Sequence, residues 1–343
     1  MAATIRDPNS KVARTIRLSI TGECNLNCFY CKPLGQTKDI FQVKNIIQAS
    51  DVTKLIKIVG ELGVNKVVIS GGEPLIRKDV ANFVKAAYAH KNVSDVRLVT
   101  NGTFLKAFAD SLRKMGLRKV DINLDTLSFV KYQKITGKDS LYRVLDGIEK
   151  VEKLNYSEIR VNVLLLKGIN ESEVVDFARL TKDRKIHIRF IEYHPRVVNV
   201  DPYAERLGLS VLSVKRAIDN FQMLVRAHDF SDEEVPISTY RFADGVGKLS
   251  FLSEMEVRQT AATPCCAFSA EGVIFNELVP GRVVPILQDL RRDAKEDRLH
   301  RAIEKVMMLH HMEAKKGHKV PGRRLPTVSA LKIRERPQVS ARR

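Results

Sequence analysis

The sequence of 343 residues has no tryptophan, only five cysteines, and no uninterrupted apolar run near the roughly 18 residues that a transmembrane helix requires. Its first residues, MAATIRDPNSK, contain no apolar signal core, so we expect that the protein is not secreted. An odd number of cysteines in such a chain is typical of metal or redox use in a reducing compartment, rather than of a disulfide framework. These absences predict a cytoplasmic protein without a membrane segment.

Positive charge is in excess, with 58 Lys and Arg residues against 40 Asp and Glu residues and a net charge of +18. This excess predicts an anionic partner, which the count leaves open among nucleic acid, a membrane surface and a phosphorylated small molecule. The hydrophobic share of 44% is typical of a globular protein. The last 31 residues, 313–343, carry ten basic and two acidic side chains and form a predicted basic tail.

Strand-like and helical patterns alternate over the first part of the chain. Short β-branched, apolar runs predict six strands, at Thr15–Ile20, Lys66–Ser70, Asp95–Thr100, Lys119–Leu124, Ile159–Leu166 and Ile186–Ile191. Helical patterns lie between them, at Ile46–Leu62, Val80–His90, Leu105–Met115, Tyr142–Leu154 and Glu171–Thr181. Right-handed connections turn such a series into a parallel sheet or barrel, with functional residues at the C-terminal ends of the strands.

The pattern changes after about residue 195. Helices are predicted at Val211–Phe221 and over Pro285–Met312, and strands at Thr239–Phe242, Gly247–Leu252 and Val273–Phe275. We therefore divide the chain into an N-terminal arm (1–12), a core (13–195), a C-terminal region that covers the substrate (196–312) and the basic tail (313–343).

Three cysteines follow the first predicted strand at C-x3-C-x2-C spacing: Cys24, Cys28 and Cys31. Three thiolates can surround one soft metal centre, but they are one short of the four ligands that a structural zinc site takes. On a 4Fe–4S cluster they would leave one iron without a protein ligand, which suits a cluster that binds a substrate or cofactor. The alternative is a zinc site completed by a distant His or Cys.

A second motif, Gly71-Gly72-Glu73-Pro74, follows the second predicted strand. Paired glycines let a ligand approach the backbone closely, and the Glu73 carboxylate can accept hydrogen bonds from an ammonium group. A turn without any ligand is the alternative for this motif taken alone. Its position one β–α unit after the cysteines favours a shared site.

The two motifs, with Tyr30 before the last cysteine, resemble the radical S-adenosylmethionine (radical SAM) superfamily. The resemblance implies an α/β fold: a partial (β/α)6 TIM-type barrel with a smaller C-terminal α+β extension. It implies a 4Fe–4S cluster on Cys24, Cys28 and Cys31. It also implies that S-adenosylmethionine (SAM) contacts Tyr30, Gly71, Gly72, Glu73, Pro74, Thr100, Asn101 and Asn123.

Further segments look like the GTP 3′,8-cyclase family of molybdenum cofactor biosynthesis, among them Thr100-Asn101-Gly102 and Asp121-Ile-Asn-Leu-Asp125. That family carries a second, C-terminal cluster. At the comparable positions this sequence has Thr260, Thr263 and Glu277, and two adjacent cysteines, Cys265 and Cys266, lie nearby. Side chains of adjacent residues tend to diverge. These two are therefore interpreted as small core residues, with a metal or reactive role as the alternative. We infer a single-cluster enzyme that does not use GTP as the cyclase does.

Four cations on predicted strands form the candidate substrate site: Arg17, Lys66, Arg160 and Arg189. In the resembled fold they could point into the barrel, where cations bind phosphate, although each could equally form a structural ion pair or lie on a solvated face. His194, near the end of the sixth predicted strand, is a candidate acid or base, with a packed imidazole as the alternative.

The resemblance implies that the cluster cleaves SAM reductively to a 5′-deoxyadenosyl radical, which abstracts hydrogen from the substrate. We predict a biosynthetic enzyme whose substrate is a small anion, such as a nucleotide or nucleotide sugar, and whose electron donor is a flavodoxin or ferredoxin. One alternative is a divergent GTP 3′,8-cyclase-like protein, catalytic or degenerate. The other is a non-catalytic iron–sulfur or zinc protein that binds nucleic acid. The basic tail has no interleaved aromatic residues, which argues against nucleic acid.

Overall fold

The computed structural model describes residues 15–31, 47–193, 207–227, 238–253, 264–275, 283–292 and 299–306. Six parallel strands lie side by side in chain order at its centre, which confirms the predicted α/β arrangement. They are β1 (Thr15–Ser19), β2 (Lys66–Ser70), β3 (Asp95–Thr100), β4 (Lys119–Asn123), β5 (Glu158–Leu165) and β6 (His187–Glu192). The bounds of β2 and β3 are those predicted, and the others differ by one residue at one or both ends.

Alternation along each strand separates the two faces of the sheet. In β1, Ile16 and Leu18 are fully buried in the main hydrophobic core, whereas Arg17 between them lies on the opposite face. The same alternation places Val96 and Leu98 of β3 in the core, with Arg97 between them. On the central strands one face is therefore mainly apolar, and most of the charged residues lie on the other.

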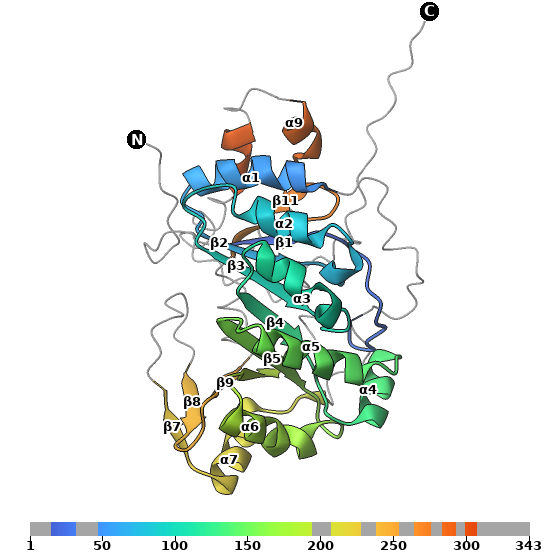
Figure 1. Ribbon diagram of the computed structural model, residues 1–343, viewed down its shortest axis with the longest axis vertical. Coiled ribbons are helices and arrows are strands. Elements are labelled where there is room, and N and C mark those ends of the chain that lie inside the picture. The colour runs from blue at the N-terminus through green and yellow to red at the C-terminus, as the bar shows by residue number, and fades with distance from the viewer. Residues whose placement is uncertain are drawn as a thin grey trace, which may run out of the picture.

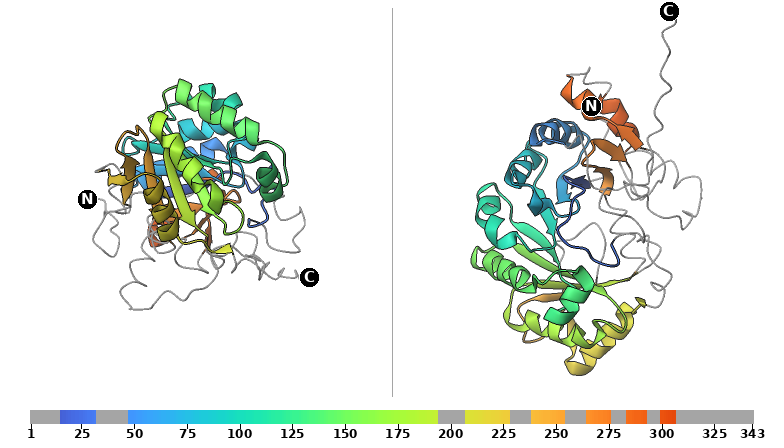
Figure 2. Two further views of the ribbon diagram at one scale, coloured as in Figure 1. Left: turned by 90° about the horizontal axis from the view of Figure 1, so that it is seen from below. Right: turned by 90° about the vertical axis from the view of Figure 1, so that its right-hand side faces the viewer.

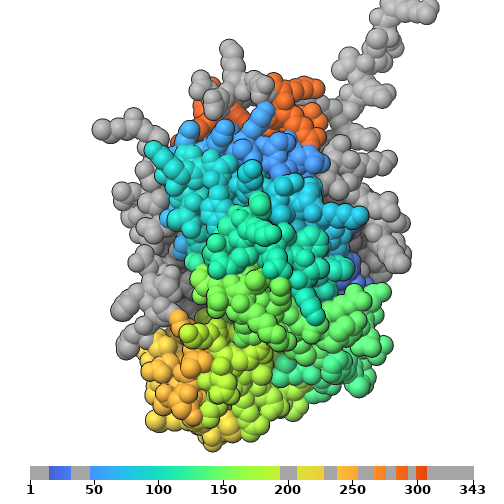
Figure 3. All heavy atoms as spheres, viewed as in Figure 1, coloured from blue at the N-terminus to red at the C-terminus, as the bar shows by residue number. Residues whose placement is uncertain are grey.

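Helices cover the apolar face. They are α1 (Ala49–Glu61), α2 (Val80–Ala87), α3 (Leu105–Lys114), α4 (Phe129–Thr136), α5 (Leu141–Lys153) and α6 (Val174–Asp183), with short 3-10 turns η2 (Pro74–Ile76) and η3 (Glu171–Glu173). The strands curve into an open arc with these helices outside (Figures 1 and 2). The outer surface follows chain order from α1 down to α6 (Figure 3). No described helix has both the length and the apolar character needed to cross a bilayer.

The helix α4 was not among the predicted elements. Its sequence carries recognisable end signals, because the Ser128 side chain accepts a hydrogen bond from the Lys131 N–H and Gly137 ends the helix with φ of 70°. With α4 and α5 between β4 and β5, this connection contains one helix more than the sequence predicted.

The described C-terminal strands extend the same sheet at both edges. The parallel strand β9 (Lys248–Leu252) pairs with β6, and the parallel strand β10 (Pro264–Phe268) pairs with β1. Beyond them lie β8 (Thr239–Phe242) and β7 (Leu224–Arg226) on one side, and β11 (Val273–Phe275) and β12 (Val283–Pro285) on the other. Strands β7, β10 and β12 were not predicted. Strand β10 pairs with the distant β1, whereas β7 and β12 are three-residue strands that pair with the nearby β8 and β11.

Helical segments of the C-terminal part complete the described fold. The predicted helix α7 (Val211–Phe221) has the expected bounds, and α9 (Leu287–Arg291) packs on α1, where Arg291 is 2.8 Å from Asp51. Of the predicted helix over Pro285–Met312, the structure describes α9 and helical residues 299–306. The proposed domain boundaries stay predictions.

Candidate active site at the strand ends

The loop after β1 carries the three cysteines and is here called the cysteine loop (residues 20–31). Cys24, Cys28 and Cys31 are present as thiols and line one cavity of about 140 Å³ at the C-terminal ends of the strands. A single water needs roughly 10–15 Å³ of such space, so this cavity is far larger than a packing defect. Other predicted residues line the same cavity: Tyr30, Gly71, Gly72, Thr100, Asn101 and Asn123.

The glycine turn after β2 packs directly against the cysteine loop. The Gly72 N–H donates to the Thr21 carbonyl at 2.8 Å, and the Glu73 N–H donates to the Glu23 carbonyl at 2.7 Å. A Cβ on Gly72 would lie 2.2 Å from the Glu23 oxygen, and one on Gly71, whose φ is +148°, would lie 2.4 Å from the Thr21 oxygen. The glycines are therefore needed where two backbones meet, in addition to lining the cavity.

Glu73 is fully buried and joins the ends of two strands. Its carboxylate accepts hydrogen bonds from the Thr100 hydroxyl at 2.7 Å, the Asn101 N–H at 2.6 Å and the Leu75 N–H at 2.9 Å. Burial raises the pKa of Glu73, and these three hydrogen bonds oppose the rise. A carboxylate has about four acceptor positions, so capacity for one further donor remains. Pro74 is buried at the start of η2.

The C-terminal end of α4 supports the cysteine loop from the other side. The N–H groups of Asn27 and Phe29 donate to the carbonyls of Thr136 and Ile135, at 2.8 and 3.1 Å. Carbonyls in the last turn of a helix have no partner within the helix, so they are available to fix an adjacent loop. The unpredicted helix α4 is therefore part of the site.

Tyr30 connects the cysteine loop to β4 and β5. Its hydroxyl donates to Asp125, whose other carboxylate oxygen accepts from the Leu164 N–H at 2.9 Å. Burial raises the pKa of Asp125 to about 6, although both hydrogen bonds oppose the rise. Tyr30 is thus held by its hydroxyl at the cavity wall, with its ring edge-on to Phe29.

The donor set of the cavity fits an iron–sulfur cluster. Burial, and then the charges of Asp125 and the other two thiols, raise the pKa of Cys28 to about 12. No lysine or arginine is among the described residues that line the cavity, so three thiolates there require a cationic group. Within the described part of the chain, no three His, Cys or acidic side chains converge on a single metal ion. The thiols border a cavity of about 140 Å³, which suits a cluster better than one zinc ion.

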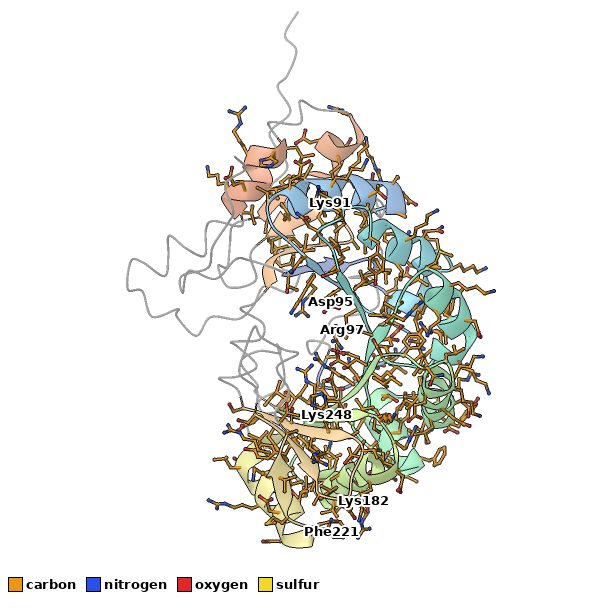
Figure 4. All side chains as sticks on the ribbon, turned by 60° about the vertical axis from the view of Figure 1, so that its left-hand side comes forward. Lys91, Asp95, Arg97, Lys182, Phe221 and Lys248 are labelled. Atoms are coloured by element: carbon orange, nitrogen blue, oxygen red, sulfur yellow. The ribbon has the colours of Figure 1, made fainter. Side chains whose placement is uncertain are left out.

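The concave face of the sheet, below this cavity, carries an ion network. Arg97 of β3 lies 2.6 Å from both Asp121 of β4 and Glu158 of β5. Burial favours protonation of both carboxylates, but the surrounding guanidinium groups outweigh it: the pKa of Asp121 is lowered, and that of Glu158 falls to about 2. In Figure 4, Arg97 and Lys248 lie on this concave side.

Two of the four predicted substrate cations belong to this network. Arg160 forms an ion pair with Glu158, and Arg189 lies 3.6 Å from Asp121. The register of the strands places Arg17 of β1 and Lys66 of β2 on the same face as Arg97 and Asp95 respectively. None of the four lines the cavity that the three cysteines border. The cations therefore lie along the strands, whereas the thiols lie at the C-terminal ends of the strands.

His187 of β6 is a partly buried histidine that was not predicted from the sequence. Its Nε2 lies 2.8 Å from the Ser250 hydroxyl. Burial, together with the charges of Arg160, Arg189 and Lys248, holds its pKa well below the usual value. A neutral imidazole at this position adds no charge to the network.

Several predicted residues lie outside the described ranges: His194, Thr260, Thr263, Glu277 and the basic tail. Cys266 is fully buried in the main core, as the core interpretation predicts, and of its neighbour Cys265 only the backbone in β10 is described.

Asp125, Arg97, Asp121 and Glu158 were also missed as site residues. Asp125 lies two positions after Asn123 at the end of β4, and side chains at this spacing in a strand point to the same face. This spacing could have identified Asp125 from the sequence as a neighbour of the predicted SAM contact.

Comparison with known proteins connects the site to a superfamily. The sequence model of the radical SAM superfamily matches residues 18–181. A GTP 3′,8-cyclase of Lactiplantibacillus plantarum is 41% identical over 180 residues, which are 52% of this chain and 54% of that protein. The matches to the first relatives thus span little more than half of their length.

Two further relatives match over longer stretches. The GTP 3′,8-cyclase of Alkaliphilus metalliredigens is 33% identical over 73% of this chain and 76% of its own length. That of Thermodesulfovibrio yellowstonii is 30% identical over 86% of this chain and 90% of its own length.

Solved structures show the same fold at low identity. Streptococcus suis SuiB bound to S-adenosylmethionine has a TM-score of 0.53 at 15% identity, covering 85% of this chain and 66% of SuiB. The protein anSMEcpe with bound AdoMet has a TM-score of 0.55 at 15% identity, covering 88% and 82%.

Gly72→Ala is expected to weaken cluster binding. The new methyl group would meet the Glu23 carbonyl at 2.2 Å, and relieving such overpacking costs about 1–3 kcal/mol. The shift would move the cysteine loop. We therefore expect a lower iron content after anaerobic reconstitution, measured per folded chain. Gly168→Ala is the control, because no atom lies within 4 Å of the Cβ that it adds, whereas its positive φ, which Gly72 does not share, adds backbone strain of its own. Equal iron content in both variants would contradict the proposed packing.

The ion network predicts a dependence of stability on pH. Because the pKa of Glu158 falls to about 2, its ionised form stabilises the protein above the unfolded pKa of about 4.3, and this contribution is lost as the pH falls towards 2. Arg97→Leu should lower the free energy of unfolding at pH 7 by about 3–5 kcal/mol, because it leaves the buried carboxylate of Asp121 and the partly buried one of Glu158 with fewer partners. Urea unfolding should give a smaller difference in the free energy of unfolding between Arg97→Leu and the wild type at pH 4 than at pH 7. A constant difference would argue against an ionic origin.

Proposed function

The chain belongs to the radical SAM superfamily, and we propose that it is an enzyme that uses one 4Fe–4S cluster and SAM to abstract hydrogen from a small anionic substrate. The observation that supports this most directly is the common cavity of the three thiols. Glycine and asparagine residues at the positions expected for SAM line the same cavity.

The proposed cofactors supply reductive cleavage of SAM to a 5′-deoxyadenosyl radical when they are bound. The chain provides three thiolates for the cluster and leaves the fourth coordination position open to SAM. Glu73 is held in place by three donors, and the proposal assigns its remaining acceptor position to the amino group of SAM; Glu73 itself is fully buried beside the lining residues of the cavity and is not one of them. Tyr30 and Asp125 fix the cysteine loop against the strand ends.

The charge of the concave face supports an anionic substrate. On the described central strands and β9, seven cationic side chains share this face with three acidic ones: Arg17, Lys66, Arg97, Lys119, Arg160, Arg189 and Lys248 against Asp95, Asp121 and Glu158. Phosphate groups are bound by such guanidinium and ammonium groups. The proposed substrate class is a nucleotide or nucleotide sugar, bound mainly through Arg17, Lys66, Arg160 and Arg189.

A second candidate is the reaction named for the relatives, in which GTP is the substrate. The identity over most of the Thermodesulfovibrio and Alkaliphilus proteins favours it. The residues at the positions comparable to the ligands of the family's second cluster argue against it. These are Thr260, Thr263 and Glu277, and none of them can supply a thiolate. Incubation of the reconstituted protein with GTP, SAM and dithionite separates the two, since GTP-dependent 5′-deoxyadenosine formation would support the cyclase reading.

The partners and location are part of the same proposal. Reduction of the cluster requires an electron donor, for which we propose a flavodoxin or ferredoxin. The described cysteines are thiols, which is consistent with a reducing compartment such as the cytoplasm.

Cys28→Ala should abolish both the cluster absorbance and SAM cleavage, because two thiolates do not retain a 4Fe–4S cluster in this open cavity. The measurement is iron and sulfide content, together with 5′-deoxyadenosine formation under dithionite. Cys266→Ala is the matched control, since that thiol is buried in the core away from the cavity. Full activity of Cys28→Ala would refute the ligand assignment. About eight irons in the wild type, the content of two such clusters, would refute the single-cluster proposal.

Binding of an anion should depend on the concave face. Inorganic triphosphate is the probe, measured by isothermal titration calorimetry. Arg17→Gln and Lys66→Gln should each weaken binding about tenfold, because a hydrogen bond to a charged group contributes about 1.5 kcal/mol. Lys57→Gln is the control on an exposed position of α1. Unchanged binding in both strand variants would remove Arg17 and Lys66 from the proposed site.

A further inference from the structure

The side-chain amide of Asn101 has a defined orientation. Its Oδ1 accepts hydrogen bonds from the Thr103 N–H at 3.0 Å and from the Thr103 hydroxyl at 2.7 Å. A backbone N–H can only donate, so the atom that faces it is the oxygen of the amide and not the nitrogen. The Nδ2 of Asn101 therefore faces the other way, towards the cysteine loop.

The two hydrogens of Nδ2 have two acceptors in that loop. One is the Asn25 Oδ1 at 2.8 Å, and the other is the Cys24 Sγ at 3.9 Å. The Asn25 Nδ2 in turn donates to the Thr103 hydroxyl at 2.8 Å, which closes a ring of three side chains. The Asn101 backbone N–H is also fixed, by Glu73 at 2.6 Å. These contacts prevent the amide from turning away from Cys24.

This arrangement uses the full hydrogen-bonding capacity of the side chain. A primary amide has two donor hydrogens and two acceptor lone pairs, and all four are engaged by residues of this chain. The side chain therefore has no polar group left for SAM, although it lines the cavity. Its role differs in this respect from the SAM contact expected from the sequence resemblance.

We infer that Asn101 is a positioning residue that donates an N–H···S hydrogen bond to the Cys24 ligand and raises the reduction potential of the cluster. The inference rests on the proposed function, because it assumes a cluster on Cys24. Hydrogen bonds to the ligating sulfurs disperse negative charge and stabilise the reduced, more negative cluster. Without this donor, transfer of an electron to the cluster becomes less favourable.

The test compares midpoint potentials by redox titration monitored by electron paramagnetic resonance. Asn101→Leu removes the donor without adding charge and is similar in size, and Asn101→Asp replaces the donor nitrogen with oxygen. Both should shift the potential to more negative values, with the larger shift for Asn101→Asp because of its charge. Thr103→Val is the matched control, since it opens the side-chain ring but keeps the Thr103 N–H that orients Asn101. Its potential should stay close to that of the wild type.

The outcomes separate this inference from the proposed function. A wild type that assembles no cluster contradicts the proposed function. A wild type with a cluster, whose potential is unchanged in both Asn101 variants, overturns the inference alone. SAM binding is measured in parallel by equilibrium dialysis and should be retained in Asn101→Leu. An unchanged potential with a tenfold loss of SAM affinity would assign Asn101 to SAM instead.

A measurement on the wild type does not depend on the folding of any variant. The reduced cluster of protein labelled with ¹⁵N-asparagine should show a weak hyperfine coupling to an amide nitrogen in pulsed electron paramagnetic resonance. Absence of this coupling would overturn the proposed N–H···S contact.

Discussion

The contact between the cysteine loop and the glycine turn positions the whole site. Two backbone hydrogen bonds, from Gly72 to Thr21 and from Glu73 to Glu23, bring the ends of β1 and β2 together. Side chains larger than hydrogen do not fit between these backbones. Once the contact forms, Glu73 lies under the turn and gathers donors from β3, and the thiols are directed into one cavity. The chemistry at the strand ends therefore depends on a packing constraint between two main chains.

Charge is separated along the axis of the barrel. Thiols and the buried carboxylates of Glu73 and Asp125 lie at the C-terminal rim, where cationic iron and the amino group of SAM would balance them. Guanidinium and ammonium groups predominate on the concave strand face beneath, where Arg97 has two acidic partners. The C-terminal rim thus favours a cationic ligand, and the concave strand face favours an anionic one. An anionic substrate on the strand face would be adjacent to the SAM cavity without competing for it.

Local patterns were sufficient to predict the central strands and the cysteine and glycine motifs, because periodicity and spacing are properties of short segments. The strand β10 was missed because its pairing with β1 joins residues about 250 positions apart. Arg97 was missed because a charged residue in an apolar run gives no sign of its buried partners, which come from two other strands. The helix α4 was missed although Ser128 and Gly137 mark its ends. Its role in holding the cysteine loop becomes visible only in three dimensions.

The ion network restricts how a substrate could bind. Three guanidinium groups, from Arg97, Arg160 and Arg189, lie around the two carboxylates of Asp121 and Glu158. The carboxylates hold the guanidinium planes in place and leave a net positive charge, so an anion does not have to organise them on binding. For the proposed anionic substrate, the network would thus act on the charge of the ligand before any contact with its reacting carbon, and this contribution would not require a second cluster.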